Sequence, residues 1–440
     1  SLNKTIESAL TTSVANKIYK FDTSIYNELT TSGWTPVGGS TIMTPGVGYI
    51  AMGPTDGTFP QTQDVVFEGP VNNGIIQTPI RLSADDTKDN EDWNLIGNPY
   101  PSGIDADLLL GDSLNRDVVG GSIYLWTHNT ARNTNPGEQD YNSGDYATYT
   151  FGTGGVAATS GGQRPKGIIA SGQSFFIEGA SNGNITFNNS MRVNSGNDQF
   201  FRAPASKNSQ NEQDKIWLNL TTDYGAFNQL LIGFINGATD GIDRSYDAHK
   251  FGGGWVSFYS IADGEHLAVQ GRKALNEKES VKLGFSSYVN ETEILKIGID
   301  KLEGKFKESE YEIYLKDKFL NKIHDLNQQD YEFINESKGI YNDRFELVIQ
   351  KSAILHVEED VLNNQLIIKK SEGQLRVSTS NNSIISNFQA YNLLGKLLID
   401  KSPNKNFLIS STNNISEGTI LIIRTTLLSM EVLTKKIILH

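Results

Sequence analysis

Short apolar runs separated by polar and glycine-containing segments extend along the whole chain. Within most runs, apolar and polar residues alternate, and Val, Ile, Tyr, Phe and Thr predominate, a pattern typical of half-buried strands. In the first 200 residues the runs are ANKIYKFD, GVGYIAMG, DVVFEG, SIYLWTHN, YATYTFGT, SFFIEG and NITFNNS. One short helix is expected in this part, within Ile104–Leu114, IDADLLLGDSL. The pattern therefore predicts an all-β protein.

Composition changes along the chain predict several domains. Residues 1–204 are predicted to form a first β-rich module. The polar segment 205–215 lacks apolar periodicity and is predicted to be a linker. Alternation resumes in 216–352, with IWLNLTTD, NQLLIGFING, VKLGFSS, EYEIYLKD and FELVIQK, and predicts a second β-sandwich. The last block, 353–440, contains about seven strand-like runs, the usual number for a small sandwich. We expect tandem β-sandwich domains that end in a small seven-stranded β-sandwich.

Net charge and cysteine content exclude several classes of partner and site. The 440 residues include 51 acidic and 38 basic side chains, a net charge of -13, which disfavours binding to nucleic acid. The chain has 0 cysteines, so disulfides and thiolate metal sites are excluded. The opening SLNKTIESAL lacks an initiator Met and a signal-peptide pattern, and we expect a piece of a longer or processed protein.

The apolar C-terminal stretch Thr419–His440 predicts strands, not a membrane anchor. Arg424, Glu431, Lys435 and Lys436 interrupt it at depths where charge is costly in a bilayer. We expect the chain not to span a membrane.

Three segments of the last block resemble the C-terminal sorting domain of type IX secretion substrates, which Bacteroidota export across the outer membrane. These segments are AYNLLGKLL (Ala390–Leu398), EGTILIIRTT (Glu417–Thr426) and the terminal TKKIIL (Thr434–Leu439). The block lacks a Pro-Asn-Pro near its start, and it is similar to the type C or an atypical type A subclass. Upstream segments such as WNLIGNPYPSGID (Trp93–Asp105) and IIASGQSFFIEG (Ile168–Gly179) look like parts of large flavobacterial surface proteins that end in this signal.

The resemblance implies a secreted or cell-surface protein without enzymatic activity, whose upstream modules are cargo. The implied partners are the type IX outer-membrane translocon, an SprA-like barrel, and a PorV-like shuttle protein. We expect the strand Ile420–Ile423 to keep a terminal hairpin docked. We expect Lys435 and Lys436 to pair with an acidic rim of the receptor. The residues expected to form the recognition signal are Tyr391, Leu394, Gly395, Ile420, Leu421, Ile422, Ile423, Lys435 and Lys436.

The string GDSL at Gly111–Leu114 reproduces the nucleophile motif of GDSL esterases. The other blocks of such enzymes are missing, and the nearest Asp-His candidate, Asp247–His249, has the wrong spacing and lies beyond the expected linker. No catalytic residue is therefore assigned, and a hydrolase with Ser113 as nucleophile is the least favoured alternative. The sequence around Ser113 is also similar to the Asp-Ser/Thr-aliphatic motif for O-glycosylation in secreted Bacteroidota proteins. Ser113 is therefore a candidate glycan attachment site.

Two acidic loops contain carboxylates that suit calcium, although neither has the spacing of a calcium-binding loop. The carboxylates are Asp85, Asp86, Asp89 and Asp92 in the first loop, and Asp240, Asp243 and Asp247 in the second. Solvated turns are the commoner origin of such loops. The 6 histidines show no paired metal-ligand spacing. We therefore expect no cofactor, with calcium as the alternative.

The five tryptophans offer a second functional hypothesis, an adhesin or carbohydrate-binding module that contacts a surface glycan. Exposed aromatic faces suit sugar rings, whereas tryptophans at strand starts more often belong to a core. They are Trp34, Trp93, Trp126, Trp217 and Trp255.

Overall fold

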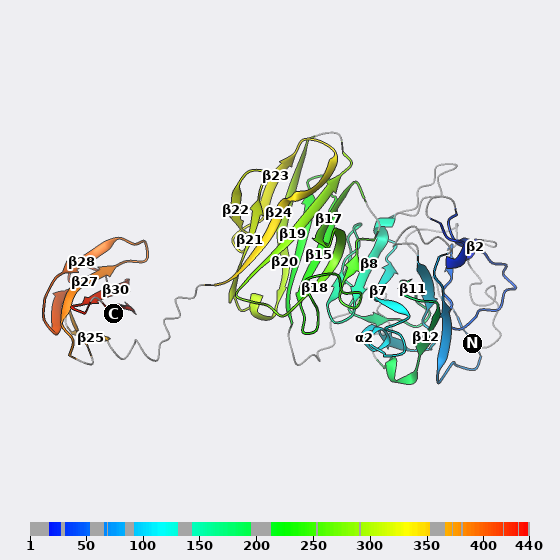
Figure 1. Cartoon of the computed structure of the whole chain (residues 1–440), viewed down its shortest axis with the longest axis horizontal. Helices are drawn as coiled ribbons and strands as arrows, with labels where there is room; N and C mark the ends of the chain where they lie inside the picture. Colours follow the sequence, from blue (N-terminus) through cyan, green and yellow to red (C-terminus); the bar gives the residue numbers. More distant parts are fainter. Residues whose placement is uncertain are drawn as a thin grey trace. The chain divides into compact units, whose positions relative to one another are not determined.

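The computed structural model shows a protein built mainly of strands (Figure 1). Of the described residues, 54% lie in strands and 5% in helices. The predicted all-β, tandem β-sandwich fold is confirmed. The structure describes residues 17–27, 31–52, 66–67, 69–83, 92–130, 143–194, 213–251, 254–289, 292–352, 366–371, 373–379, 382–416, 418–429 and 431–438.

The chain divides into two compact units, Ser1–Ser352 and Ala353–His440. Within the described residues, no helix has the length and apolar character needed to cross a membrane.

The described residues of the first part of the larger unit form four small sheets and one short α-helix. Their orders are β2-β1-β3, β10-β6-β13, β5-β11-β7-β8-β9 and β12-β4. The strands are β1 (Ile18–Phe21), β2 (Trp34–Pro36), β3 (Ile50–Ala51), β4 (Ile76–Ile80), β5 (Trp93–Gly97), β6 (Gly103–Asp105), β7 (Val119–Trp126), β8 (Tyr146–Thr150), β9 (Gly154–Val156), β10 (Ile168–Ile169), β11 (Ser174–Gly179), β12 (Gly183–Phe187) and β13 (Arg192–Val193). Short 3-10 helices lie at η1 (Thr23–Ile25), η2 (Ser143–Asp145) and η3 (Asn189–Met191).

The α-helix, α2 (Ala106–Leu110), falls inside the segment predicted to be helical. It begins where the Asp105 carboxylate accepts a hydrogen bond from the Leu108 amide, a usual N-cap arrangement. Leu109 and Leu110 are buried in the core between the small sheets, whereas Leu108 faces solvent. The amphipathic turn thus covers one side of that core.

The second part of the larger unit is a single sheet of 11 strands that curls around one core. Its order is β22-β21-β24-β19-β17-β18-β15-β14-β20-β23, and β16 pairs with β18. The strands are β14 (Asp214–Thr222), β15 (Phe227–Phe234), β16 (Ala248–His249), β17 (Val256–Ala262), β18 (Glu265–Arg272), β19 (Lys278–Ser287), β20 (Glu293–Glu303), β21 (Tyr311–Asp317), β22 (Lys322–Asp325), β23 (Tyr331–Asn335) and β24 (Gly339–Lys351), with η4 (Gly304–Phe306) between β20 and β21. Asp214 and Lys215, placed in a linker by the sequence pattern, belong to β14.

Contacts between strands that are not sheet neighbours show how the curled sheet closes. Phe333 of β23 packs against Phe285 of β19 and Phe345 of β24, with ring centroids 5.4 and 4.8 Å apart. All three side chains are buried. The two ends of the sheet therefore share one aromatic-rich core.

The two parts of the larger unit pack against each other through small residues. A Cβ on Gly121 of β7 would lie 2.3 Å from the backbone oxygen of Ser245, so only glycine permits this close approach. The indole of Trp217 is buried against Val156 and donates a hydrogen bond to the Gly155 carbonyl oxygen at 2.9 Å. These contacts join the β-rich module and the curled sheet into one compact unit.

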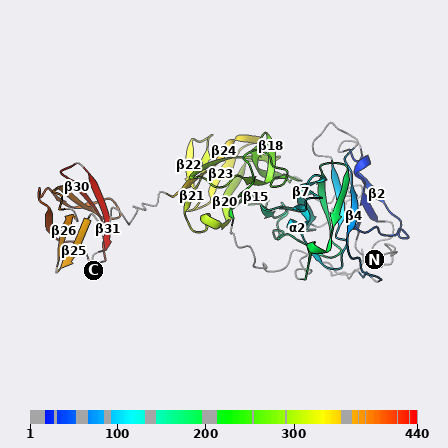
Figure 2. The same cartoon turned by 60° about the horizontal axis from the view of Figure 1, so that its bottom comes forward.

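The terminal unit is a two-layer β-sandwich with seven described strands. One sheet has the order β25-β26-β29 and the other β28-β27-β30-β31. The strands are β25 (Leu366–Ser371), β26 (Gln374–Thr379), β27 (Ile385–Tyr391), β28 (Leu397–Lys401), β29 (Phe407–Ser411), β30 (Ile420–Leu427) and β31 (Val432–Ile438). Figure 2 shows β25 beside β26 and β30 beside β31. Leu375, Phe388, Leu421 and Ile423 fill its own separate core, so this unit has the internal packing of an independent domain.

The run Asn387–Asp400 forms two strands because a turn interrupts it. Gly395 has a φ of +77°, a conformation that glycine adopts without steric cost. The Asn392 side-chain oxygen accepts hydrogen bonds from the amides of Leu394 and Lys396 and closes this turn. The run at residues 354–360, which the pattern also predicts as a strand, lies outside the described residues.

Candidate functional site

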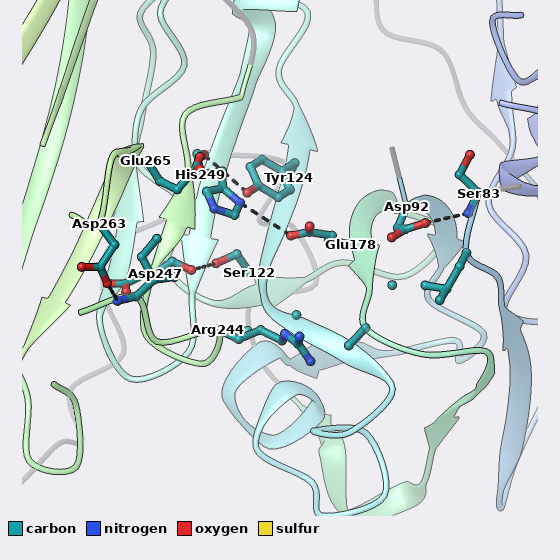
Figure 3. A pocket seen from close by; sticks show the side chains of 16 residues that line it. Ser83, Asp92, Ser122, Tyr124, Glu178, Arg244, Asp247, His249, Asp263 and Glu265 are labelled. Atoms are coloured by element: carbon teal, nitrogen blue, oxygen red, sulfur yellow. Dashed lines mark hydrogen bonds and ion pairs between the residues drawn. The ribbon is translucent and has the colours of Figure 1, made fainter. Parts of the chain in front are cut away.

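A cavity of about 600 Å³ lies in the larger unit, where β7 and β11 face the segment around β16 and the β17–β18 hairpin (Figure 3). Most of the groups that line it are polar. Its lining residues are Leu82, Ser83, Asp92, Gly120, Gly121, Ser122, Tyr124, Glu178, Gly179, Ala180, Ile242, Arg244, Asp247, His249, Asp263 and Glu265. A cavity of this size with a few convergent polar groups is the usual form of a small-molecule site.

An imidazole–carboxylate pair forms one wall of this cavity. His249 Nδ1 lies 3.8 Å from Glu178 Oε2, and both side chains are one-quarter exposed. The interaction with Glu178 raises the pKa of His249 although burial opposes it. Figure 3 shows the two side chains pointing toward each other from β16 and β11. The pair is therefore positioned by two strands from different parts of the unit.

The Asp247 carboxylate holds the backbone of this wall in place. It is buried, and its oxygens accept hydrogen bonds from the amides of Asp243 at 2.6 Å and Gly271 at 2.7 Å. Burial raises the pKa of Asp247 to about 7 despite these two bonds. Ser122 donates a hydrogen bond to the Asp247 carbonyl oxygen at 3.0 Å and so ties β7 to the same segment.

Charged side chains surround the mouth of the cavity. Arg244, Asp263 and Glu265 are exposed there. Among the described residues, Arg244 and Glu265 have no side-chain hydrogen bond or ion pair, and their polar atoms are available to a ligand. Tyr124 is buried, which raises its pKa, and its hydroxyl donates a 3.5 Å hydrogen bond to the His249 carbonyl oxygen.

Sequence reasoning singled out three residues of this site: Asp92 and Asp247 as calcium ligands, and Asp247 with His249 as an ill-spaced Asp-His pair. Glu178 and the glycine pair Gly120–Gly121 were missed. A lone carboxylate inside the apolar run SFFIEG was the one available signal for Glu178. The juxtaposition of β7, β11 and β16 depends on long-range packing that no local pattern reveals.

The chain matches two family models over most of its length. The DUF8693 model, a domain of unknown function, matches residues 2–349. The chain belongs to the DUF8693 family. A second model, DUF8694, also a domain of unknown function, matches residues 355–439 of this DUF8693 protein. A comparison with curated proteins found no match.

Of the carboxylates proposed as calcium ligands, those that the structure describes interact with backbone amides or basic side chains. Asp240 pairs with Arg272 at 3.0 Å, Asp243 accepts a hydrogen bond from the Thr239 amide, and Asp92 accepts one from the Ser83 amide at 2.6 Å. Asp85, Asp86 and Asp89 lie outside the described residues. Within the part of the chain that the structure describes, no group of three or more His, Asp or Glu side chains could hold a metal ion.

Ser113 is exposed in the turn that follows α2. The preceding Asp112 accepts hydrogen bonds from the Leu114 amide and from Asn188, so it stabilises the turn. Across the described ranges, no histidine or carboxylate forms a hydrogen bond with Ser113, and Ser113 does not line the cavity that contains His249. The exposed hydroxyl is accessible to a glycosyltransferase.

The tryptophans do not form one surface platform. Trp93 and Trp217 are buried and Trp34 and Trp126 are half-buried, whereas Trp255 is 73% exposed. Trp34 and Trp93 pack edge-on against aromatic neighbours in the cluster beside β11. Four of the five thus contribute to packing.

In the terminal sandwich, the expected recognition residues divide between the two faces of one sheet. Cross-strand register places Tyr391, Ile422 and Lys436 in one row on the outer face. Ile420 belongs to the same outward face of β30, and Leu394 and Gly395 occupy the β27–β28 turn, with Leu394 93% exposed. The residues on the inner face are Leu421, Ile423 and Lys435. The two lysines therefore have different environments.

Proposed function

We propose that this chain belongs to an exported cell-surface protein and that residues 353–440 are its type IX secretion signal. The observation that supports this proposal is the location of the three segments that resemble the sorting domain. Residues 390–398, 417–426 and 434–439 are separated in sequence, yet most of their described residues fall on β27, β28, β30 and β31, and the rest lie in the β27–β28 turn or directly before β30. These four strands make up one complete sheet of the terminal unit. The similarity thus lies on one sheet, and the part of it on the outer face is available to a receptor.

The outer face of this sheet is the surface proposed to contact the type IX machinery. The row Tyr391–Ile422–Lys436 combines a phenol, an aliphatic side chain and an ammonium group. Beside it, the register aligns Gln389 with Arg424 and Thr434. Exposed side chains on a rigid sheet present a fixed pattern to a receptor at low entropic cost.

Export of paired variants tests this assignment. The double variant Ile422→Thr/Lys436→Glu alters the outer row, and the matched control Ile409→Thr/Lys369→Glu alters an equivalent row on the other sheet, where Lys369 and Ile409 flank Arg376. In a type IX-competent bacterium, we expect the first variant to lower the amount of protein outside the cell at least fivefold and the control to leave it unchanged. Equal export of both variants, with equal thermal stability, would contradict the proposed surface.

A further inference from the structure

The cavity between β7, β11 and the β16 segment has a lining that suits one class of ligand. We propose that it binds a neutral, hydroxyl-rich ligand, a mono- or disaccharide, through Glu178, His249 and Arg244. A site of this kind is separate from the terminal secretion signal, because all of its residues belong to the larger unit. It would supply the binding activity of the exported cargo.

Both signs of charge converge on this cavity, and this favours hydroxyl groups. Carboxylates such as Glu178 and Glu265 only accept hydrogen bonds, whereas the Arg244 guanidinium only donates them. Each sugar hydroxyl both donates and accepts, so neighbouring hydroxyls can satisfy such groups together. The polar lining therefore matches a polyol without requiring any charge on the ligand.

Other ligand classes fit the lining less well. Asp92, Glu178, Asp263 and Glu265 would repel an anion. Among the described residues no group of three or more His, Asp or Glu side chains could hold a metal ion, and an organic cation is the competing class that spermidine tests. An apolar ligand would displace water from Arg244 and Glu265 without replacing its hydrogen bonds, which costs free energy. A cavity of about 600 Å³ lies within the roughly 300–1,000 Å³ range typical of small-molecule sites and exceeds what a single ion needs.

The Glu178 carboxylate in the wall of the site is both paired and accessible. Its Oε2 lies 3.8 Å from His249 Nδ1, an ion-pair distance that favours this orientation of the carboxylate. A Cβ on Gly120 would lie 3.6 Å from Glu178 Cβ and 3.8 Å from Oε2, so the glycine leaves space directly beside the carboxylate. Because the φ of Gly120 is not positive, its backbone conformation does not require glycine, and a side chain here would occupy the space proposed for the ligand.

A glycan microarray and calorimetry test the proposal with the full chain. The array should contain neutral hexoses, pentoses, deoxyhexoses and N-acetylhexosamines as mono- to trisaccharides, with glucuronic acid and spermidine as charged probes in solution. We expect the chain to bind at least one neutral saccharide. Glu178→Gln, which keeps the side-chain shape, and Arg244→Ala should each weaken that binding at least tenfold.

Matched variants separate loss of the site from loss of the fold. Glu332→Gln changes an exposed glutamate of β23, and Arg376→Ala changes an exposed arginine of the terminal unit; each should alter the affinity less than twofold. Gly120→Val should abolish binding, while Gly38→Val, at an exposed glycine with no atom closer than 4.0 Å, should not. The proposal is overturned by an array without a bound neutral saccharide, by a preference for glucuronic acid or spermidine, or by affinity that the Glu178 and Arg244 variants leave unchanged.

Discussion

Lys435 Nζ donates a hydrogen bond to the backbone carbonyl oxygen of Leu366 at 3.0 Å, and this bond connects the two sheets of the terminal sandwich. The adjacent Lys436 points outward, because successive side chains of a strand alternate between faces. The two lysines of the motif TKKIIL therefore have different roles. Lys435 stabilises the domain, and Lys436 belongs to the surface proposed to be recognised.

Replacing Lys435 by Met should lower the free energy of unfolding of residues 353–440 by about 1 kcal/mol. A hydrogen bond from a charged donor is worth roughly 1.5–3 kcal/mol when buried, and this one is partly solvated. Urea unfolding followed by circular dichroism measures the change. Lys436→Met is the control and should leave the urea midpoint of unfolding equal, within error, to that of the wild type. Equal effects of the two substitutions would refute the division of roles.

Gly395→Ala should destabilise the same unit by about 1 kcal/mol through backbone conformation alone. Its φ of +77° disfavours any residue with a Cβ, and no atom lies within 4 Å of the position of the added carbon. Gly395→Asn should cost less, because Asn adopts this conformation more readily. Thermal unfolding of the three proteins should rank them Gly, Asn, Ala. An Ala variant as stable as the wild type would show that the turn rearranges.

Asp317→Asn should strongly destabilise the curled sheet, by roughly 3 kcal/mol, because it leaves the buried Arg344 guanidinium without its counter-charge. Burial raises the pKa of Asp317, but hydrogen bonds from Arg344 and the Leu320 amide more than offset this and lower the pKa below its usual range. The stabilisation is therefore present above the unfolded-state pKa of about 4 and is lost as pH falls through the folded-state pKa. Denaturation at pH 7 and at pH 2.5 measures both effects. If the free energy of unfolding of the wild type exceeded that of Asp317→Asn by the same amount at both pH values, the prediction would be contradicted.

Asp247 should produce the opposite pH dependence. Burial raises its pKa from 3.8 to about 7, so the folded state retains the proton longer than the unfolded state. Its contribution to the free energy of unfolding should decrease as pH rises from about 4 to about 7, by about 1.4 kcal/mol per unit of pKa difference. The comparison of wild type with Asp247→Asn in urea across this range isolates the slope. If the difference in free energy of unfolding between the two proteins did not change with pH, the hydrogen bonds from Asp243 and Gly271 would keep Asp247 at its ordinary pKa.

The sequence pattern predicts the elements better than it predicts their assembly. The all-β fold, the helix at Ala106–Leu110 and the small terminal sandwich follow from local periodicity and capping. Packing of the β-rich module against the curled sheet could not be predicted. It depends on the hydrogen bond from Trp217 to the Gly155 carbonyl oxygen, and these residues are far apart in sequence.

The candidate sites show the same limit. The cavity residues Glu178 and His249 come from strands far apart in sequence and become neighbours only after β11 and β16 are placed. In the terminal unit, strand periodicity alone separates Lys435 from Lys436, yet the partner of Lys435 is an uncharged backbone oxygen that no sequence pattern identifies.

The most direct test of the proposed function is export of a reporter. Residues 353–440, behind a signal peptide and a fluorescent protein, are expressed in a type IX-competent bacterium and in a sibling that lacks the translocon. We expect the reporter outside the competent cells and in the periplasm of the deficient ones. Periplasmic retention of a correctly folded fusion in both strains would contradict the claim that this unit is a sufficient secretion signal.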